Sequence, residues 1–168
     1  MTENATNTFG NLKRQALRLT IYKIWKMIRE DNFDELKPEE QKLSMLIMSH
    51  QEYQEYYENE EILDGREFEI PGRFNPFLHI SLHQMVEDQL ASENPVEAVL
   101  LCEYIEKMGH PRHTAIHVII MIMMNMIADS FRNEGRFNED RYKRLLVKCR
   151  NVKPSEMQDV VEREFSGN

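Results

Sequence analysis

Cysteine is scarce in this sequence: only Cys102 and Cys149 occur among 168 residues. They lie far apart, and neither belongs to a CxxC pair. This pattern excludes a small fold held together by disulfides and a structural zinc site closed by thiolates. Two isolated thiols suit a reducing compartment, so we expect a cytoplasmic protein.

An excess of positive charge is also lacking. The chain has 21 Lys and Arg against 29 Asp and Glu, which gives a formal net charge of -8 and a pI of about 5.3. A field of that sign repels phosphate backbones, so we expect no nucleic acid among the partners. A protein partner stays possible, and the sequence predicts no oligomeric state.

Long hydrophobic runs are absent too. The most apolar stretch, residues 115–128, is shorter than the roughly 18 apolar residues of a membrane span, and it contains a histidine and an asparagine. We therefore expect a buried helix there and no membrane partner. Residues 1–10 are polar and lack the apolar region of a signal peptide, so we expect a disordered leader.

No stretch alternates apolar and polar residues as a half-buried strand does, whereas apolar residues recur at helical spacing along much of the chain. The sequence predicts an all-α fold: a helical bundle of about four to five main helices with two smaller C-terminal helices. We expect a single domain over residues 11–168.

Proline, asparagine and glycine mark the expected helix ends. Proline at the first helical position and asparagine as the N-cap favour helix starts, and glycine favours a stop. The predicted starts are Pro38, Asn75–Pro76, Asn94–Pro95, Pro111 to His113, Asn138 and Pro154, and the predicted stop is Gly109. The second helix is expected to continue from Pro38 through Tyr57, and residues 62–74 are expected to form a long loop.

Histidines recur four residues apart on two of these helices. His79 and His83 are followed at the same interval by Glu87, so the three side chains share one face of a helix. His113 and His117 repeat the spacing on a second helix, on the face expected to meet the bundle core. His50 falls in the apolar stripe of the second helix, whereas His110 lies between Gly109 and Pro111 and is expected in a turn.

This donor set favours a metal site. Imidazole nitrogens and a carboxylate suit zinc, iron, manganese or nickel, and inward-facing His and Glu from several helices build metal sites in bundle cores. Leaving such groups unsatisfied in an apolar core would cost a few kcal/mol each. We expect one or two divalent ions held by these candidate ligands: His50, His79, His83, Glu87, His113 and His117.

The alternative is a non-enzymatic protein-interaction module whose core histidines only form hydrogen bonds. A variant of it is a fold that responds to pH, because imidazoles charge near pH 6.5. Whether the protein is an enzyme stays open: an ion with an open coordination position activates water or binds a small molecule, whereas a saturated ion is structural. The chain has no phosphate-binding loop, serine nucleophile elbow or HExxH base.

Three segments carry a resemblance to a known family. SHQEY, NPFLHISLHQMVEDQL and RHTAIHVII resemble an uncharacterised bacterial family classed as domain of unknown function 1841, over roughly residues 37–132. The resemblance implies no activity and marks the same six candidate ligands. One position departs from the family pattern: Gln54 stands where that pattern has a second histidine after His50. A looser similarity, to hemerythrin-like and damage-inducible DinB-like metal bundles, is one of fold alone.

Overall fold

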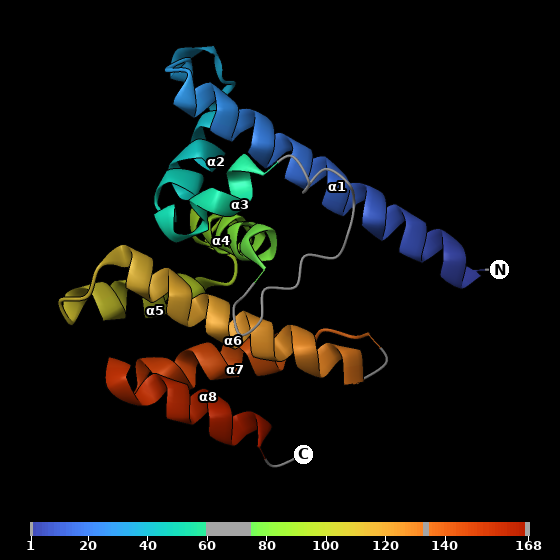
Figure 1. Cartoon of the computed structure of the whole chain (residues 1–168). Helices are drawn as coiled ribbons and strands as arrows, with labels where there is room; N and C mark the ends of the chain where they lie inside the picture. The colour runs from blue at the N-terminus through green and yellow to red at the C-terminus, as the bar shows by residue number, and fades with distance from the viewer. Residues whose placement is uncertain (1, 60–74, 133–134, 167–168) are drawn as a thin grey trace. The chain divides into compact units, whose positions relative to one another are not determined.

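The computed structural model describes residues 2–59, 75–132 and 135–166, with side chains described from residue 15 onwards. These ranges contain eight α-helices and no strand, which confirms the all-α prediction and gives more helices than expected. The long loop expected at residues 62–74 lies outside the described residues. The chain forms two compact units, Met1–Gln84 and Met85–Asn168 (Figure 1), and each is described separately. The single domain expected over residues 11–168 stays a prediction.

The first unit is organised around the long helix α1 (Thr2–Arg29), against which α2 (Pro38–Met48) and α3 (Gln54–Glu58) pack. The helix begins inside the segment for which the sequence predicted a disordered leader. Extending an existing helix adds one hydrogen bond for each residue fixed, so polar residues continue a helix that the apolar stripe has started. That stripe lies where the spacing placed it, with Ile21 and Ile24 fully buried.

The predicted continuous helix from Pro38 to Tyr57 is wrong, because α2 ends at Met48. The Ser49 hydroxyl donates to the Leu46 carbonyl over 2.8 Å, and this satisfies a last-turn oxygen that further helix would otherwise use. His50 then leaves the helical conformation at φ -119°, ψ 59°, and a 3-10 turn, η2 (Gln51–Tyr53), leads into α3. His50 therefore lies at a bend in the chain.

Helix α4 (Pro76–Ala91) begins where the sequence predicted. The Asn75 side-chain oxygen accepts hydrogen bonds from the backbone amides of Phe77 and Leu78, at 3.0 and 3.3 Å, and so caps the helix. Phe77 and Ile80 on its first turns join the core of the first unit. The buried residues of that core are Ile21, Ile24, Leu36, Leu43, Ile47, Tyr53, Tyr57, Phe77 and Ile80.

The second unit contains α5 (Val96–Lys107), α6 (Arg112–Arg132), α7 (Glu139–Arg150) and α8 (Met157–Phe165), with α6 packed against the other three (Figure 1). Gly109 ends α5 as predicted: at φ +88° its amide donates to the Glu106 carbonyl and the His110 amide donates to the Ile105 carbonyl. These two bonds form a Schellman motif. Asn138 caps α7, also as predicted, by accepting from the Arg141 amide.

The buried face of α6 differs from the predicted one. Ile116 and Ile120, on the same side of the helix as the histidines, are buried, whereas Phe131 on that side is 80% exposed. Ile119, Ile122 and Met126 are also buried, and at about 100° per residue they lie more than a right angle from His113 and His117, so the buried face extends beyond the predicted one. This helix is apolar almost all round, so periodicity alone could not select its core face.

An ion-pair network joins α6, α7 and α8. The Arg141 guanidinium donates to Asp129 on α6 over 2.7 Å, and to both the side chain and the backbone carbonyl of Glu164 on α8. Lys148 also contacts Glu164 over 2.7 Å. Its hydrogen bond holds the pKa of Glu164 below the ordinary value, although burial opposes this, and Arg141 adds to the lowering. The network fixes α8 to the rest of the unit.

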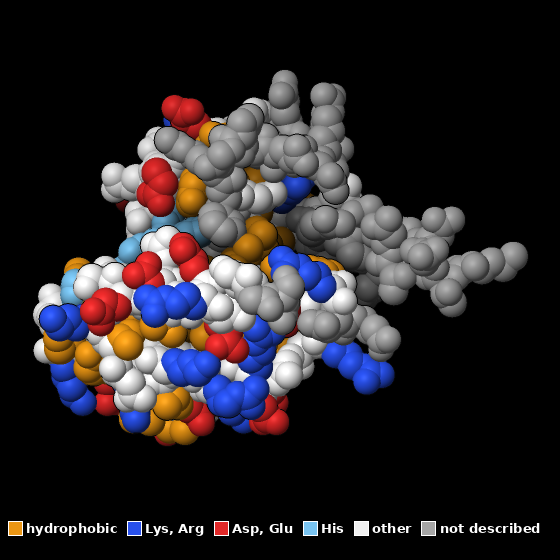
Figure 2. Space-filling model, turned by 90° about the horizontal axis from the view of Figure 1, so that it is seen from below, with side chains coloured by type: hydrophobic (Ala, Val, Ile, Leu, Met, Phe, Trp, Pro, Cys, Tyr) orange, Lys and Arg blue, Asp and Glu red, His pale blue; other side chains and the backbone are white. Residues whose placement is uncertain are grey.

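Charged residues of both signs share the surface of α7 and α8. Figure 2 shows Lys and Arg side chains interspersed with Asp and Glu and with hydrophobic side chains over this face. Lys143 pairs with Glu139 over 2.6 Å, in addition to the contacts of Arg141 and Lys148. Arg141, Lys143 and Lys148 of α7 therefore form ion pairs within the unit.

Helix α6 meets the length and composition test for a membrane span, and it is the one helix among the described residues that does. Core helices of soluble proteins pass the same test. Seven apolar side chains of α6 are buried, which is the pattern of a core helix.

Candidate metal centre

The bend after α2 positions the first candidate ligand. His50 is 1% exposed and lies at the N-cap of η2, with its ring nitrogens directed to two different partners. Its Nδ1 lies 2.8 Å from a carboxylate oxygen of Glu52, two residues further along the chain. Its Nε2 lies 3.0 Å from Nε2 of His83.

The second and third ligands are on α4, one turn apart. His83 is completely buried and His79 is half-buried. Their Nε2 atoms lie 3.1 Å apart, and their ring centroids 4.7 Å apart. The ring of His79 also meets that of His50 edge-on, with centroids 4.5 Å apart. Three imidazoles of the first unit thus form one cluster, which we call the histidine cluster, with the Nε2 atom of His83 next to the other two.

The spacing of these nitrogens matches that of ligands around one ion. Nitrogens bound to a metal at about 2.0–2.1 Å lie about 2.9 Å apart at a right angle and about 3.3 Å apart at the tetrahedral angle. Two of the three separations, 3.0 Å between His50 and His83 and 3.1 Å between His79 and His83, fall between these values. The histidine cluster could therefore hold a metal ion.

Glu52 gives the cluster its nearest carboxylate. Burial tends to raise the pKa of Glu52, but the hydrogen bond with His50 and the nearby imidazoles of His50 and His79 lower it, so the pKa lies below its ordinary value. Because the Glu52 side chain is half exposed, water also stabilises its charge. An ionised carboxylate only accepts hydrogen bonds, so the shared proton belongs to Nδ1 of His50.

Tyr53 forms an aromatic wall beside the cluster. Its buried ring stacks on His50 with centroids 5.8 Å apart, and it meets His79 edge-on at 5.4 Å. Tyr57, also fully buried, continues the aromatic surface towards Trp25 and Phe77. Burial raises the pKa of Tyr57, and the charge of Glu52 raises it further, so this phenol stays neutral. Such surroundings exclude water from one side of the cluster.

The remaining predicted ligands lie in the second unit. His113 and His117 are half-buried neighbours on α6, with ring centroids 4.3 Å apart, so the predicted pair is present. Glu87 accepts a hydrogen bond from Arg112 over 2.8 Å. Its role as a metal ligand stays a prediction, and binding an ion would require Glu87 to give up this contact. His110 is exposed outside any helix, as expected of a turn residue.

Sequence reasoning missed Glu52 and Tyr53 as parts of the centre. Both follow His50 within three residues, and the continuous helix predicted there would have directed Glu52 away from His50. The available signal was the short spacing His50-Gln51-Glu52, which permits a contact only when the backbone leaves the α-helix.

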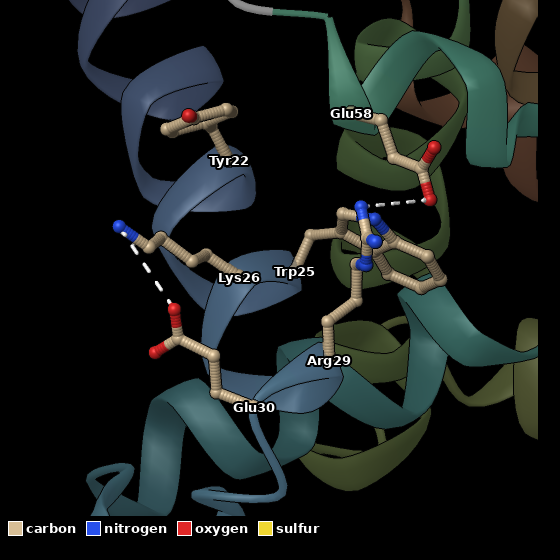
Figure 3. Close-up of a pocket in the computed structure, with 6 residues that line it drawn as sticks. All are labelled: Tyr22, Trp25, Lys26, Arg29, Glu30 and Glu58. Atoms are coloured by element: carbon tan, nitrogen blue, oxygen red, sulfur yellow. Dashed lines mark ion pairs between the residues drawn. The ribbon is translucent and has the colours of Figure 1, made fainter.

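A separate hollow in the first unit, with a volume of about 350 Å³, lies beside α1 and α3 (Figure 3). Its rim carries two ion pairs, Lys26 with Glu30 at 3.9 Å and Arg29 with Glu58 at 3.4 Å. Figure 3 shows Lys26 directed towards Glu30 and Arg29 directed towards Glu58. We assign no site to it.

The fold and the site thus define an all-α protein with a buried histidine cluster. A family model described as Domain of unknown function (DUF1841) matches residues 13–148, so the chain belongs to that family. No curated protein and no solved structure matches the chain. The looser similarity to hemerythrin-like and DinB-like bundles stays a prediction.

Proposed function

We propose that this protein binds a divalent transition-metal ion through Nε2 of His50, His79 and His83. The observation that carries the proposal is the approach of Nε2 of His83 to the other two nitrogens at 3.0 and 3.1 Å. The helical spacing and the apolar stripe of the sequence independently selected all three residues.

Hydrogen bonding alone accounts poorly for this arrangement. A neutral imidazole carries one N–H, and for His50 that proton is on the nitrogen facing Glu52. Its Nε2 is then an acceptor, and the Nε2 atom of His83 faces the Nε2 atoms of both His50 and His79. An ion between the rings would accept a lone pair from each of the three nitrogens, which favours metal binding.

The donor type narrows the choice of ion. Three imidazoles favour zinc, iron or nickel, whereas manganese prefers carboxylate oxygen. Three protein ligands also leave a tetrahedral ion one position for water, and this is the arrangement of catalytic zinc sites. The chemistry we propose for such a position is activation of water or binding of a small molecule.

His113 and His117 are a further ligand pair in this proposal, because neighbouring imidazoles one helical turn apart converge readily on an ion. If they belong to a second site, the chain binds two ions. If the chain binds one ion, a lower affinity after removal of His113 and His117 would show that the pair contributes to the same site. The number of ions per chain distinguishes one site from two.

The test is elemental analysis of untagged protein purified without chelator, before and after incubation with zinc, iron, nickel and manganese. We expect at least one ion per chain in the parent and in His110→Ala, in which an exposed turn histidine is lost. We expect a His50→Ala, His79→Ala double variant that still folds to bind at least one ion per chain fewer than the parent. Parent protein without metal after every incubation would contradict the proposal and favour the interaction module.

We further propose a cytoplasmic location. Cys102 and Cys149 are free and buried, and burial raises the pKa of each thiol to about 11. Thiols of this kind need no oxidising compartment, and their low reactivity suits a structural role in the core.

A further inference from the structure

The carboxylate of Glu52 has a defined geometric relation to the histidine cluster. It lies 2.8 Å from Nδ1 of His50, on the side of the ring opposite the nitrogen that faces His83. The contact spans only two residues, and it forms where His50 occupies the N-cap position of the 3-10 turn to which Glu52 belongs. The local backbone therefore sets this contact.

We propose that Glu52 is a positioning residue for the metal, an inference that rests on the proposed function. By accepting a hydrogen bond from Nδ1–H, Glu52 keeps His50 in the tautomer in which Nε2 is the unprotonated nitrogen. It also fixes the orientation of the ring. Histidine ligands in metal sites commonly donate their second N–H to a carboxylate in this way, and the partner increases the basicity of the ligand.

The exposure of Glu52 favours this role. The His50 side chain is 1% exposed, whereas that of Glu52 is 52% exposed, so water reaches the carboxylate but not the ring. The carboxylate thus compensates part of the charge of an ion without being buried itself. The aromatic ring of Tyr53 stacks on His50 and limits the rotation of the imidazole. The stacking and the hydrogen bond to Glu52 therefore favour the same ring orientation.

Glu55 offers a matched control. It is an exposed carboxylate three residues further on, in the first turn of α3, so its loss changes the charge of the same segment. The Glu52 inference concerns the hydrogen bond with His50, and removing Glu55 leaves that bond intact.

The experiment measures zinc affinity by competition with a chromophoric chelator, using the full chain. Glu52→Ala is expected to weaken zinc binding about 10- to 100-fold. Glu52→Gln keeps an oxygen acceptor and is expected to recover most of that loss. Glu55→Gln is expected to stay within about threefold of the parent, the small effect of a surface charge. Equal affinities of Glu52→Ala and parent would overturn the inference.

A second readout needs no metal. Long-range nitrogen–proton NMR of the chelator-treated protein reports which ring nitrogen of His50 carries the proton. We expect Nδ1–H in the parent and in Glu55→Gln, and a loss of this preference in Glu52→Ala. An unchanged tautomer in Glu52→Ala would reject the positioning role. Failure of the parent to bind zinc, iron, nickel and manganese would instead reject the proposed function, so the two failures are distinguishable.

Discussion

His83→Ala is expected to abolish metal binding at the histidine cluster. Its Nε2 is the central atom of the histidine cluster, next to the corresponding atoms of both His50 and His79. The metal affinity should fall by more than the loss of about 10- to 100-fold that follows removal of a supporting hydrogen bond. Zinc competition titration and elemental analysis measure it.

A buried histidine also contributes to folding, so the variant needs two controls. Circular dichroism should show that the helices of His83→Ala persist, and His83→Gln offers a polar side chain of similar size that cannot replace the imidazole as a ligand. His110→Ala should bind metal as the parent does. Full metal content in a folded His83→Ala or His83→Gln protein would contradict the assignment of the cluster.

Arg141→Ala is expected to lower the free energy of unfolding far more than Arg144→Ala, which removes an exposed arginine of the same helix. Removing the guanidinium leaves the carboxylate of Asp129, whose side chain is 8% exposed, without its cation. Breaking a buried ion pair by deleting one partner costs about 3–5 kcal/mol. The substitution also removes two hydrogen bonds to Glu164 and the contact with the Phe165 ring, so α8 should detach first.

Urea denaturation tests this prediction, because it gives the free energy of unfolding of the parent and of each variant. Arg144→Ala is the matched control, because it removes an exposed arginine of the same helix and should change stability by no more than about 0.5 kcal/mol. Asp129→Asn in the Arg141→Ala background should recover part of the loss, since it removes the uncompensated charge. A change below about 1 kcal/mol in Arg141→Ala would show that solvent replaces the network.

Local chemistry made much of the helical fold predictable. Asn75 and Asn138 cap helices with their side chains, and Gly109 ends α5 in a left-handed conformation, because these residues act through neighbouring backbone groups. The apolar stripe of α1 was equally clear, since one face of that helix is basic and the other is not. Each of these signals lies within a few residues of the structure that it specifies.

Other features depend on contacts that a single segment does not contain. The bend after Met48 arises from a serine hydroxyl competing for a helix carbonyl, and serine occurs inside helices as well. The core face of α6 is chosen by α5, α7 and α8, because the helix itself is apolar nearly all round. Periodicity could not resolve either feature.

The candidate site was predictable to a similar extent. Helical spacing brought His79 and His83 together, and it also identified the pair His113 and His117. His50 joined the histidine cluster for a different reason from the one expected, because it lies at a bend and not in a helical stripe. Its contact with Glu52 could not be predicted without knowledge of that bend.

X-ray absorption spectroscopy of the metal-loaded protein tests the central claim most directly. The account predicts a shell of at least three imidazole nitrogens at about 2.0–2.1 Å from the ion, with the multiple scattering that histidine rings produce. That signal should fall by one ligand in His79→Ala, whose half-buried position best tolerates replacement. A first shell of oxygen without imidazole scattering would contradict the claim that the histidine cluster is a metal centre.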